Sequence, residues 1–120
     1  MNTATIGLGV DLEENKRFLG LDRVADRPFL EKIFTPQELD YCFSRPLPAQ
    51  HLCACFVGKE AVIKALGSCG QTISSYHDIE IGHASDGAPV VTLAHHPTAH
   101  VTISLSHSAQ QSVAFVLLYW

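Results

Sequence analysis

The sequence predicts an α+β fold, because helix signals gather in the first half of the chain and strand signals in the second. This segregation favours a fold in which helices pack on a mainly antiparallel sheet, and it argues against alternating βαβ units. The 120 residues, 47% of them hydrophobic and 17% charged, fit a single domain over residues 1–120 and exclude intrinsic disorder. No repeat, low-complexity tract or linker divides the chain.

The first expected element is a strand over Ile6–Leu12, where apolar residues alternate with glycine and aspartate. We expect its apolar face to pack on the core, and Gly7 and Gly9 to clear space on the opposite face, with Asp11 at the end. Asp11 also forms, with Glu14, a D-x-x-E pattern typical of a capping box, which would begin a helix directly after Asp11.

Two further helices are indicated. Thr35–Glu38 combines a threonine cap, proline at the first helical position and glutamate at the third, and Ser44–Pro48 ends this helix. Ala49–Leu66, closed by Gly67, is the longest expected helix. Its apolar stripe includes Lys59, whose side chain either snorkels to solvent or meets an anion. Small residues on this helix form a strip over which another backbone can approach: Ala54, Gly58, Ala61 and Ala65.

The second half of the chain indicates strands. Asp78–Ile81 and Pro89–Leu93 flank Asp86-Gly87, which is typical of a hairpin turn. Val101–Ser106 alternates apolar and polar residues, and Ser112–Tyr119 is almost continuously apolar. These segments supply the strands of the expected antiparallel sheet.

Charge is distributed unevenly along the chain. The net charge of −4 argues against general nucleic-acid binding, yet all eight Lys and Arg residues lie at or before Lys64. Lys16–Lys32 carries five basic residues against three acidic ones. This segment is either a solvated helical face or a surface that attracts an acidic partner.

The sequence shows no sign of export or membrane insertion. Its apolar runs fall far short of the roughly 20 residues that a bilayer requires, and no basic and apolar leader opens the chain. The four cysteines form no C-x-x-C pair and are expected to be reduced thiols. We therefore expect a cytoplasmic protein with no membrane partner. A zinc site would have to combine Cys53, Cys55 and Cys69 with His95, His96 and His100, and these residues have no recognisable ligand spacing.

Asp11 and Glu60 are candidate ligands for one divalent cation, since Mg²⁺ prefers one or two carboxylates together with substrate phosphates. Two ordinary structural roles stand beside this interpretation. Asp11 could simply cap a helix, and Glu60 could form an i,i+4 surface pair with Lys64.

Phosphate groups are a second possible ligand. Lys59 and Lys64 lie on one helix and could supply two positive charges to phosphates. Ser106–Ser108 ends a strand and could bind a phosphate or offer His107 for proton transfer, and its alternative role is a plain turn. Two features argue against a Ser-His-Asp triad: the serines are direct neighbours of the imidazole, and no nucleophile elbow is present.

Several motifs occur together in an order that resembles the holo-[acyl-carrier-protein] synthases, the short type of 4'-phosphopantetheinyl transferase. The match extends over nearly the whole chain. Its segments are Gly7–Asp11, Arg17-Phe18, Ile33–Leu39, Phe56–Gly67, Asp78–Ile81, Gly87–Val90 and Ile103–Ser108. The resemblance implies the fold of that family and transfer of the phosphopantetheine arm of coenzyme A to a serine of an apo acyl carrier protein. It also implies Mg²⁺ as cofactor and adenosine 3',5'-bisphosphate as the second product.

Roles follow from this resemblance position by position. Asp11 and Glu60 are implied as metal ligands, and Glu60 also as the group that helps deprotonate the serine. Lys64 is implied to stabilise charge on the leaving phosphate, and His107 belongs to the same catalytic set. The implied contacts to the nucleotide phosphates are Lys59, Lys64, Gly67, Ser68, Ser106 and His107. The implied docking residues for the carrier protein are Arg17, Arg23 and Arg27.

Short members of the family are typically homotrimers with active sites between subunits, so the same assembly is implied. Three positions depart from the family pattern. Cys55 replaces an arginine that helps bind phosphate, Gly67–Gly70 alters a glycine–threonine–glycine turn, and Asn15 is usually apolar. These departures leave open a degenerate, non-catalytic module that binds coenzyme A or a carrier protein.

Overall fold

The structure is a computed structural model that describes residues 5–73 and 75–120. In chain order the elements are β1 (Ile6–Glu14), the 3₁₀ helix η1 (Asn15–Phe18), α1 (Arg27–Ile33), α2 (Pro36–Phe43), α3 (Pro48–Ser68), the 3₁₀ helix η2 (Tyr76–Asp78), β2 (Ile79–His83), β3 (Pro89–Leu93), β4 (His100–His107) and β5 (Gln111–Tyr119). The predicted α+β class is confirmed.

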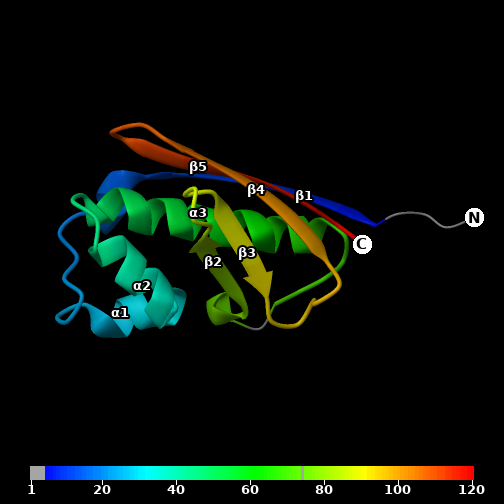
Figure 1. Ribbon diagram of the computed structural model, residues 1–120, viewed down its shortest axis with the longest axis horizontal. Helices are drawn as coiled ribbons and strands as arrows, with labels where there is room; N and C mark the ends of the chain where they lie inside the picture. Colours follow the sequence, from blue (N-terminus) through cyan, green and yellow to red (C-terminus); the bar gives the residue numbers. More distant parts are fainter. Residues whose placement is uncertain (1–4, 74) are drawn as a thin grey trace, which may run out of the picture.

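The strands of the described residues form two antiparallel sheets. β5 lies between β1 and β4 in one sheet, and β2 pairs with β3 in a hairpin. α3 runs along the three-stranded sheet, whereas α1 and α2 lie together at one end of the molecule (Figure 1). The predicted hairpin is confirmed, and its turn needs Gly87 because φ there is +90°.

α3 lies at the centre of the core. Its buried apolar side chains form one cluster with the inward face of β5. Leu52, Val62 and Leu66 of α3 and Val116 and Leu118 of β5 are at most 1% exposed. The helix extends beyond its predicted end at Leu66 to Ser68, and the residue with positive φ after it is Gly70. Within the described residues, no helix has both the length and the apolar character needed to cross a membrane.

β1 packs on α3 through its glycine face, not through its apolar face. A Cβ atom at Gly9 would overlap the carbonyl oxygen of Ala61, and one at Gly7 would overlap that of Ala65. The predicted role of the small-residue strip is thus confirmed at Ala61 and Ala65. The prediction that the apolar face of β1 packs on the core is wrong, because the helix covers the other side. The apolar side chains of that face, which are 50–57% exposed, are Ile6, Leu8, Val10 and Leu12.

The predicted capping box at Asp11 and Glu14 is also wrong. β1 continues through both residues, which pair with Ala114 and Gln111 of β5, so strand pairing displaces the helix. The following residue, Asn15, is buried and its amide donates to the Ser108 carbonyl at 3.0 Å. Asn15 therefore fixes the turn between β4 and β5, which accounts for a polar residue at this position.

A buried ion pair joins α2 to α3. Lys59 Nζ lies 2.7 Å from Glu38 Oε1, and both side chains are at most 1% exposed. Lys59 also donates to the carbonyl oxygens of Tyr76 and Ile79, at 3.0 and 2.6 Å. Glu38 accepts from the backbone N–H groups of Thr35 and Ile81, both at 2.8 Å. The predicted capping box of α2 is confirmed, and its glutamate also serves as the counterion of Lys59.

Glu38→Gln keeps the shape of the side chain but removes the charge that neutralises Lys59. We expect the free energy of unfolding to fall by about 3–5 kcal/mol, the usual cost of leaving one partner of a buried pair unneutralised. Urea denaturation followed by circular dichroism measures this loss. The matched control is Glu31→Gln, because Glu31 forms an exposed pair with Arg27 and should cost less than about 1 kcal/mol. Equal losses in the two variants would contradict a special role for the buried pair.

Candidate active site

Asp11 and Lys64 meet where β1 crosses α3. The two glycines before Asp11 bring the strand close to the helix at Ala61. The carboxylate of Asp11 therefore reaches Lys64, three residues further along the helix. Lys64 Nζ donates to Asp11 Oδ1 at 2.9 Å and to the Val10 carbonyl at 3.0 Å. The Asp11 side chain is 16% exposed and that of Lys64 is 54% exposed, so the pair borders solvent.

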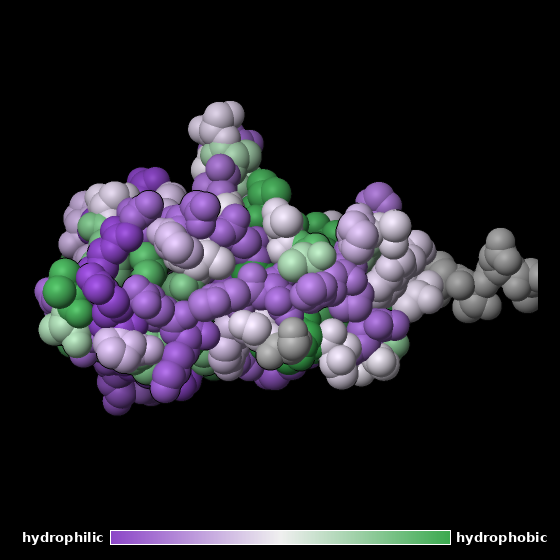
Figure 2. Space-filling view, turned by 90° about the horizontal axis from the view of Figure 1, so that it is seen from below, coloured by the Kyte–Doolittle hydropathy of each residue, from purple (hydrophilic) through white to green (hydrophobic). Residues whose placement is uncertain are grey.

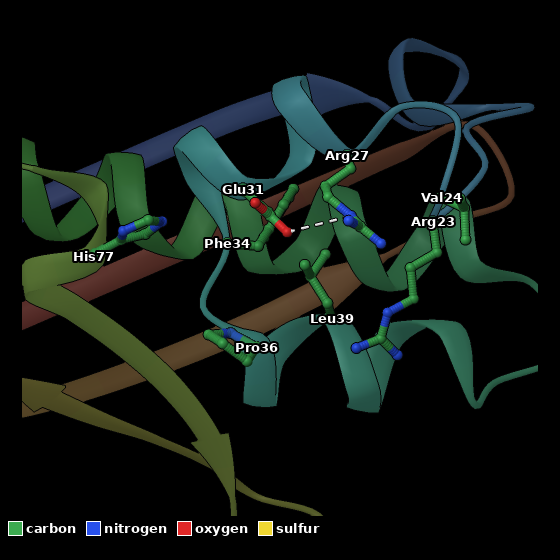
Figure 3. Close-up of a pocket in the computed structure, with 8 residues that line it drawn as sticks. All are labelled: Arg23, Val24, Arg27, Glu31, Phe34, Pro36, Leu39 and His77. Carbon is green, nitrogen blue, oxygen red and sulfur yellow. Dashed lines mark ion pairs between the residues drawn. The ribbon is translucent and has the colours of Figure 1, made fainter.

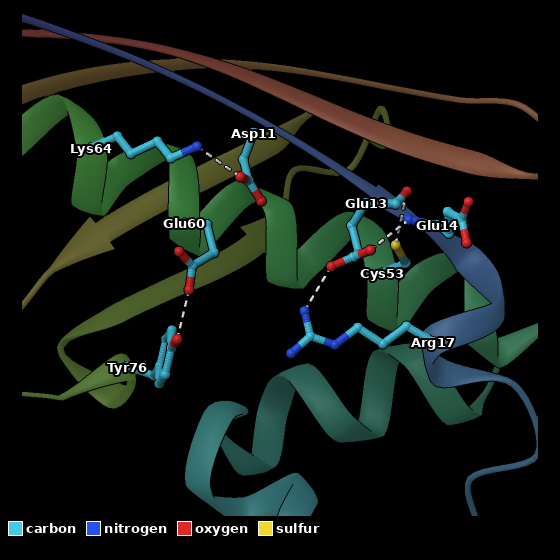
Figure 4. Close-up of polar contacts among 8 residues, drawn as sticks. All are labelled: Asp11, Glu13, Glu14, Arg17, Cys53, Glu60, Lys64 and Tyr76. Carbon is cyan, nitrogen blue, oxygen red and sulfur yellow. Dashed lines mark hydrogen bonds and ion pairs between the residues drawn. The ribbon is translucent and has the colours of Figure 1, made fainter.

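Glu60 lies one helical turn before Lys64 and takes a different partner. The Tyr76 hydroxyl donates to Glu60 Oε1 at 2.6 Å. This hydrogen bond, with burial as the next cause, raises the pKa of Tyr76 to about 12. Figure 4 shows Asp11, Glu60 and Lys64 along one side of α3, with Tyr76 approaching Glu60 from below.

The two predicted metal ligands therefore lie on facing elements. The alternative roles suggested by the sequence are not the ones observed, because Asp11 lies inside a strand and Lys64 bonds to Asp11. Carboxylate oxygens with an open side toward solvent are a donor set that suits Mg²⁺ shared with substrate phosphates. Across residues 5–73 and 75–120, no group of three or more His, Cys, Asp or Glu side chains is gathered as a metal site. Asp11 and Glu60 therefore remain candidate ligands.

Lys59 does not belong to this surface. Its ammonium is fully buried and bonded to Glu38 and two carbonyl oxygens. The prediction that Lys59 holds nucleotide phosphates is wrong for this reason. The anion that it was expected to meet is a carboxylate of the protein itself, which the sequence could not place opposite it.

The predicted phosphate contacts fall into two separate groups. Ser68 Oγ accepts from the Leu8 N–H at 3.1 Å, so Gly67 and Ser68, at the end of α3, lie beside the first part of β1. Ser106 and His107 pair with Val113 and Ser112 of β5, which in turn pair with Leu12 and Glu13 at the far end of β1. At about 3.4 Å per residue, four to five residues of strand separate the two groups. One copy of the chain does not bring them together.

Cys55 lies in the core and cannot act as an anion contact. Its thiol is 7% exposed, and burial raises its pKa well above the ordinary value. It borders a small cavity together with His51 and His83. Burial, and next the charge of Arg45, lower the pKa of His51. Arg45, His51 and His83 thus lie close enough to influence one another's charge. The sequence did not predict this group, because its members come from separate segments with no common motif.

The three predicted docking arginines are all paired at the surface. Arg17 Nη1 lies 2.6 Å from Glu13 Oε2. Arg27 pairs with Glu31 at 3.6 Å, and Arg23 pairs with Asp40. Each arginine side chain is 43–60% exposed.

Arg23 and Arg27 share one groove, from which Arg17 is absent. The groove has a volume of about 470 Å³, and its apolar floor includes Phe34 and Leu39. Figure 3 shows both guanidinium groups at its edge, and Figure 2 shows small apolar areas set among hydrophilic side chains on the face seen from below. The structure thus brings two of the three predicted docking residues together.

The fold and these motifs match a known family. The family model of the 4'-phosphopantetheinyl transferase superfamily matches residues 7–116, so the chain belongs to this superfamily.

Individual relatives agree with the family match. The holo-[acyl-carrier-protein] synthase of Chlorobaculum parvum is 37% identical over 112 residues, covering 92% of this chain and 96% of the relative. That of Desulforudis audaxviator is 38% identical over 120 residues, covering 93% and 91%. A crystal structure of the Bacillus anthracis holo-(acyl-carrier-protein) synthase in complex with CoA (3',5'-ADP) superposes with a TM-score of 0.78 at 27% identity, covering 98% of each chain.

Proposed function

We propose that this protein transfers the 4'-phosphopantetheine arm of coenzyme A to a serine of an apo acyl carrier protein and releases adenosine 3',5'-bisphosphate. The observation that carries the proposal is the grouping of Asp11, Glu60 and Lys64 on one solvent-facing side of α3. The names of the relatives, holo-[acyl-carrier-protein] synthase, support the same reaction. Phosphoryl-type transfer depends mainly on positioning and charge neutralisation, which these side chains can supply.

Asp11 and Glu60 would hold Mg²⁺, which when bound neutralises charge on the pyrophosphate of coenzyme A. The serine oxygen attacks the phosphorus nearer the pantetheine, and the bond from that phosphorus to the bridging oxygen breaks. Glu60 accepts the proton of the serine hydroxyl. Lys64, which already neutralises Asp11, supplies positive charge beside the departing nucleotide phosphate.

We propose that the complete site forms between copies of the chain in a homotrimer. Ser106 and His107 lie at the opposite end of the sheet from Gly67-Ser68, so a neighbouring copy is needed to bring both groups to one nucleotide. The sheet also offers an apolar face of the kind that protein interfaces cover. Its exposed side chains are Ile6, Leu8, Val10, Leu12, Phe115, Leu117 and Tyr119.

We further propose that Arg17, Arg23 and Arg27 meet the acidic surface of the carrier protein. Their present partners are acidic side chains on the surface, and exposed pairs of this kind contribute little stability. An acidic partner can therefore replace them at low cost. The four cysteines are free thiols, which fits the reducing cytoplasm as the site of action.

Intact-protein mass spectrometry of an apo acyl carrier protein, incubated with this protein, coenzyme A and Mg²⁺, tests the reaction. We expect a mass gain of one phosphopantetheine that is lost when the metal is chelated. Asp11→Ala should abolish the gain while changing the free energy of unfolding by less than about 1 kcal/mol, because its ion pair borders solvent. Binding of coenzyme A without any mass gain would instead favour the degenerate binding module.

Arg27→Glu tests the docking surface. We expect its affinity for the carrier protein to fall about tenfold or more, because it places a negative charge in the groove, while the affinity for coenzyme A stays unchanged. Surface plasmon resonance with immobilised carrier protein measures the first and calorimetry the second. Lys16→Glu makes the same change of charge outside the groove and is the control. Equal losses in both variants would indicate a general charge effect and not a docking contact.

Leu8→Asp tests the assembly. A charge in the middle of the apolar sheet face should convert the trimer to monomers and remove phosphopantetheine transfer, because the site would lose the residues of the neighbouring copy. Sedimentation velocity measures the mass of the particle. Leu19→Asp introduces the same change at a residue that is 74% exposed and lies after η1, outside the apolar sheet face, and should leave the trimer intact. A wild-type protein that is monomeric and active would overturn the shared site.

A further inference from the structure

The contact between Tyr76 and Glu60 is not accounted for by the predicted site. Sequence reasoning did not single out Tyr76, which lies 16 residues after Glu60, in the segment between α3 and β2. Its hydroxyl nevertheless bonds at 2.6 Å to a side chain that we assign as metal ligand and proton acceptor. An oxygen–oxygen distance of this length is typical of a strong hydrogen bond to a carboxylate.

Tyr76 is itself firmly held. Its carbonyl oxygen accepts from the buried Lys59 ammonium at 3.0 Å, so consecutive residues of α3 bind the two ends of the tyrosine. A capping box between Ser75 and Asp78 closes the 3₁₀ turn in which it lies. Its ring packs beside Phe56, with ring centroids 6.2 Å apart. The hydroxyl therefore has a fixed position that does not depend on Glu60.

The partners of the two carboxylates differ in a way that matters for a cation. Asp11 is held by the ammonium of Lys64, which competes with a metal for the same oxygen. Glu60 is held by a neutral hydroxyl, which orients the carboxylate without repelling a cation. Because Tyr76 bonds to one carboxylate oxygen, it also limits the rotation of a side chain that is otherwise flexible.

We propose that Tyr76 is a positioning residue that holds Glu60 in the orientation needed to bind the divalent cation. This inference rests on the proposed function, because it takes Glu60 as a ligand of that cation. Groups that orient metal ligands through hydrogen bonds commonly change metal affinity by 10- to 100-fold. Lys59 acts through the same chain of contacts, since it fixes the backbone from which Tyr76 extends.

Tyr76→Phe tests the proposal, because it removes the hydroxyl and keeps the ring that packs on Phe56. Mn²⁺, used alone as the probe, is titrated into the full-length protein and the free ion is measured by electron paramagnetic resonance. We expect Mn²⁺ to bind the variant about tenfold more weakly than wild type. In the transfer assay, the Mg²⁺ concentration for half-maximal rate should rise by a similar factor, with little change in kcat at saturating Mg²⁺.

Tyr41→Phe is the matched control, because it removes a phenol hydroxyl on α2 while its ring keeps its stacking on His83. It should bind Mn²⁺ as wild type does. A merely structural role for the Tyr76 hydroxyl would lower thermal stability without changing Mn²⁺ affinity, and that result would overturn the proposal. Wild-type protein that binds no Mn²⁺ would overturn it as well. Wild-type protein that transfers no phosphopantetheine, with Mn²⁺ binding still weakened by Tyr76→Phe, would overturn the proposed function alone.

Discussion

The close approach of β1 to α3 is the constraint on which the candidate site depends. Two glycines on the strand face the alanines of the helix, and no side chain larger than hydrogen fits between the backbones at Gly7 or Gly9. This contact keeps β1 close to α3, so the carboxylate of Asp11 lies within hydrogen-bond distance of Lys64. It also turns the other face of β1 outward. The ion pair of Asp11 with Lys64 and the exposed apolar sheet face thus have one common cause.

Two adjacent residues of α3, Lys59 and Glu60, point to different environments. Lys59 points into the core, where its charge is neutralised by Glu38 and joins two helices and the start of β2. Glu60 lies about 100° further round the helix and reaches the surface. Tyr76 contacts both residues, through its carbonyl and its hydroxyl. The buried ion pair and the surface carboxylate are therefore mechanically connected, although only one of them faces solvent.

Two observations agree with the proposed assembly: the predicted phosphate contacts are separated within one copy, and one face of the sheet is apolar and exposed. Under the proposed function, residues from two copies would together contact one nucleotide, which residues at opposite ends of the sheet in one copy would not. A domain of 120 residues has little interior to enclose a ligand, so a site shared between copies offers burial that one copy lacks. An apolar sheet face provides the contact that such copies need.

The sequence by itself determined α2, α3 and the strands, but it did not indicate α1, and it predicted a helix where β1 continues through Asp11 and Glu14. The cap at Thr35, the long apolar helix and the hairpin turn are local patterns, and each appears where it was predicted. The grouping of Asp11, Glu60 and Lys64 was accessible because motif spacing resembles a known family.

Tertiary structure alone decided which face of β1 is covered and which partners the charges take. Alternation along a strand marks two faces but does not say where the helix lies, so the covered face of β1 was predicted wrongly. Likewise, Lys59 meets Glu38 across 21 residues of chain, and Tyr76 meets Glu60 across 16. Such contacts depend on how the elements pack in space, and local sequence patterns do not predict that packing.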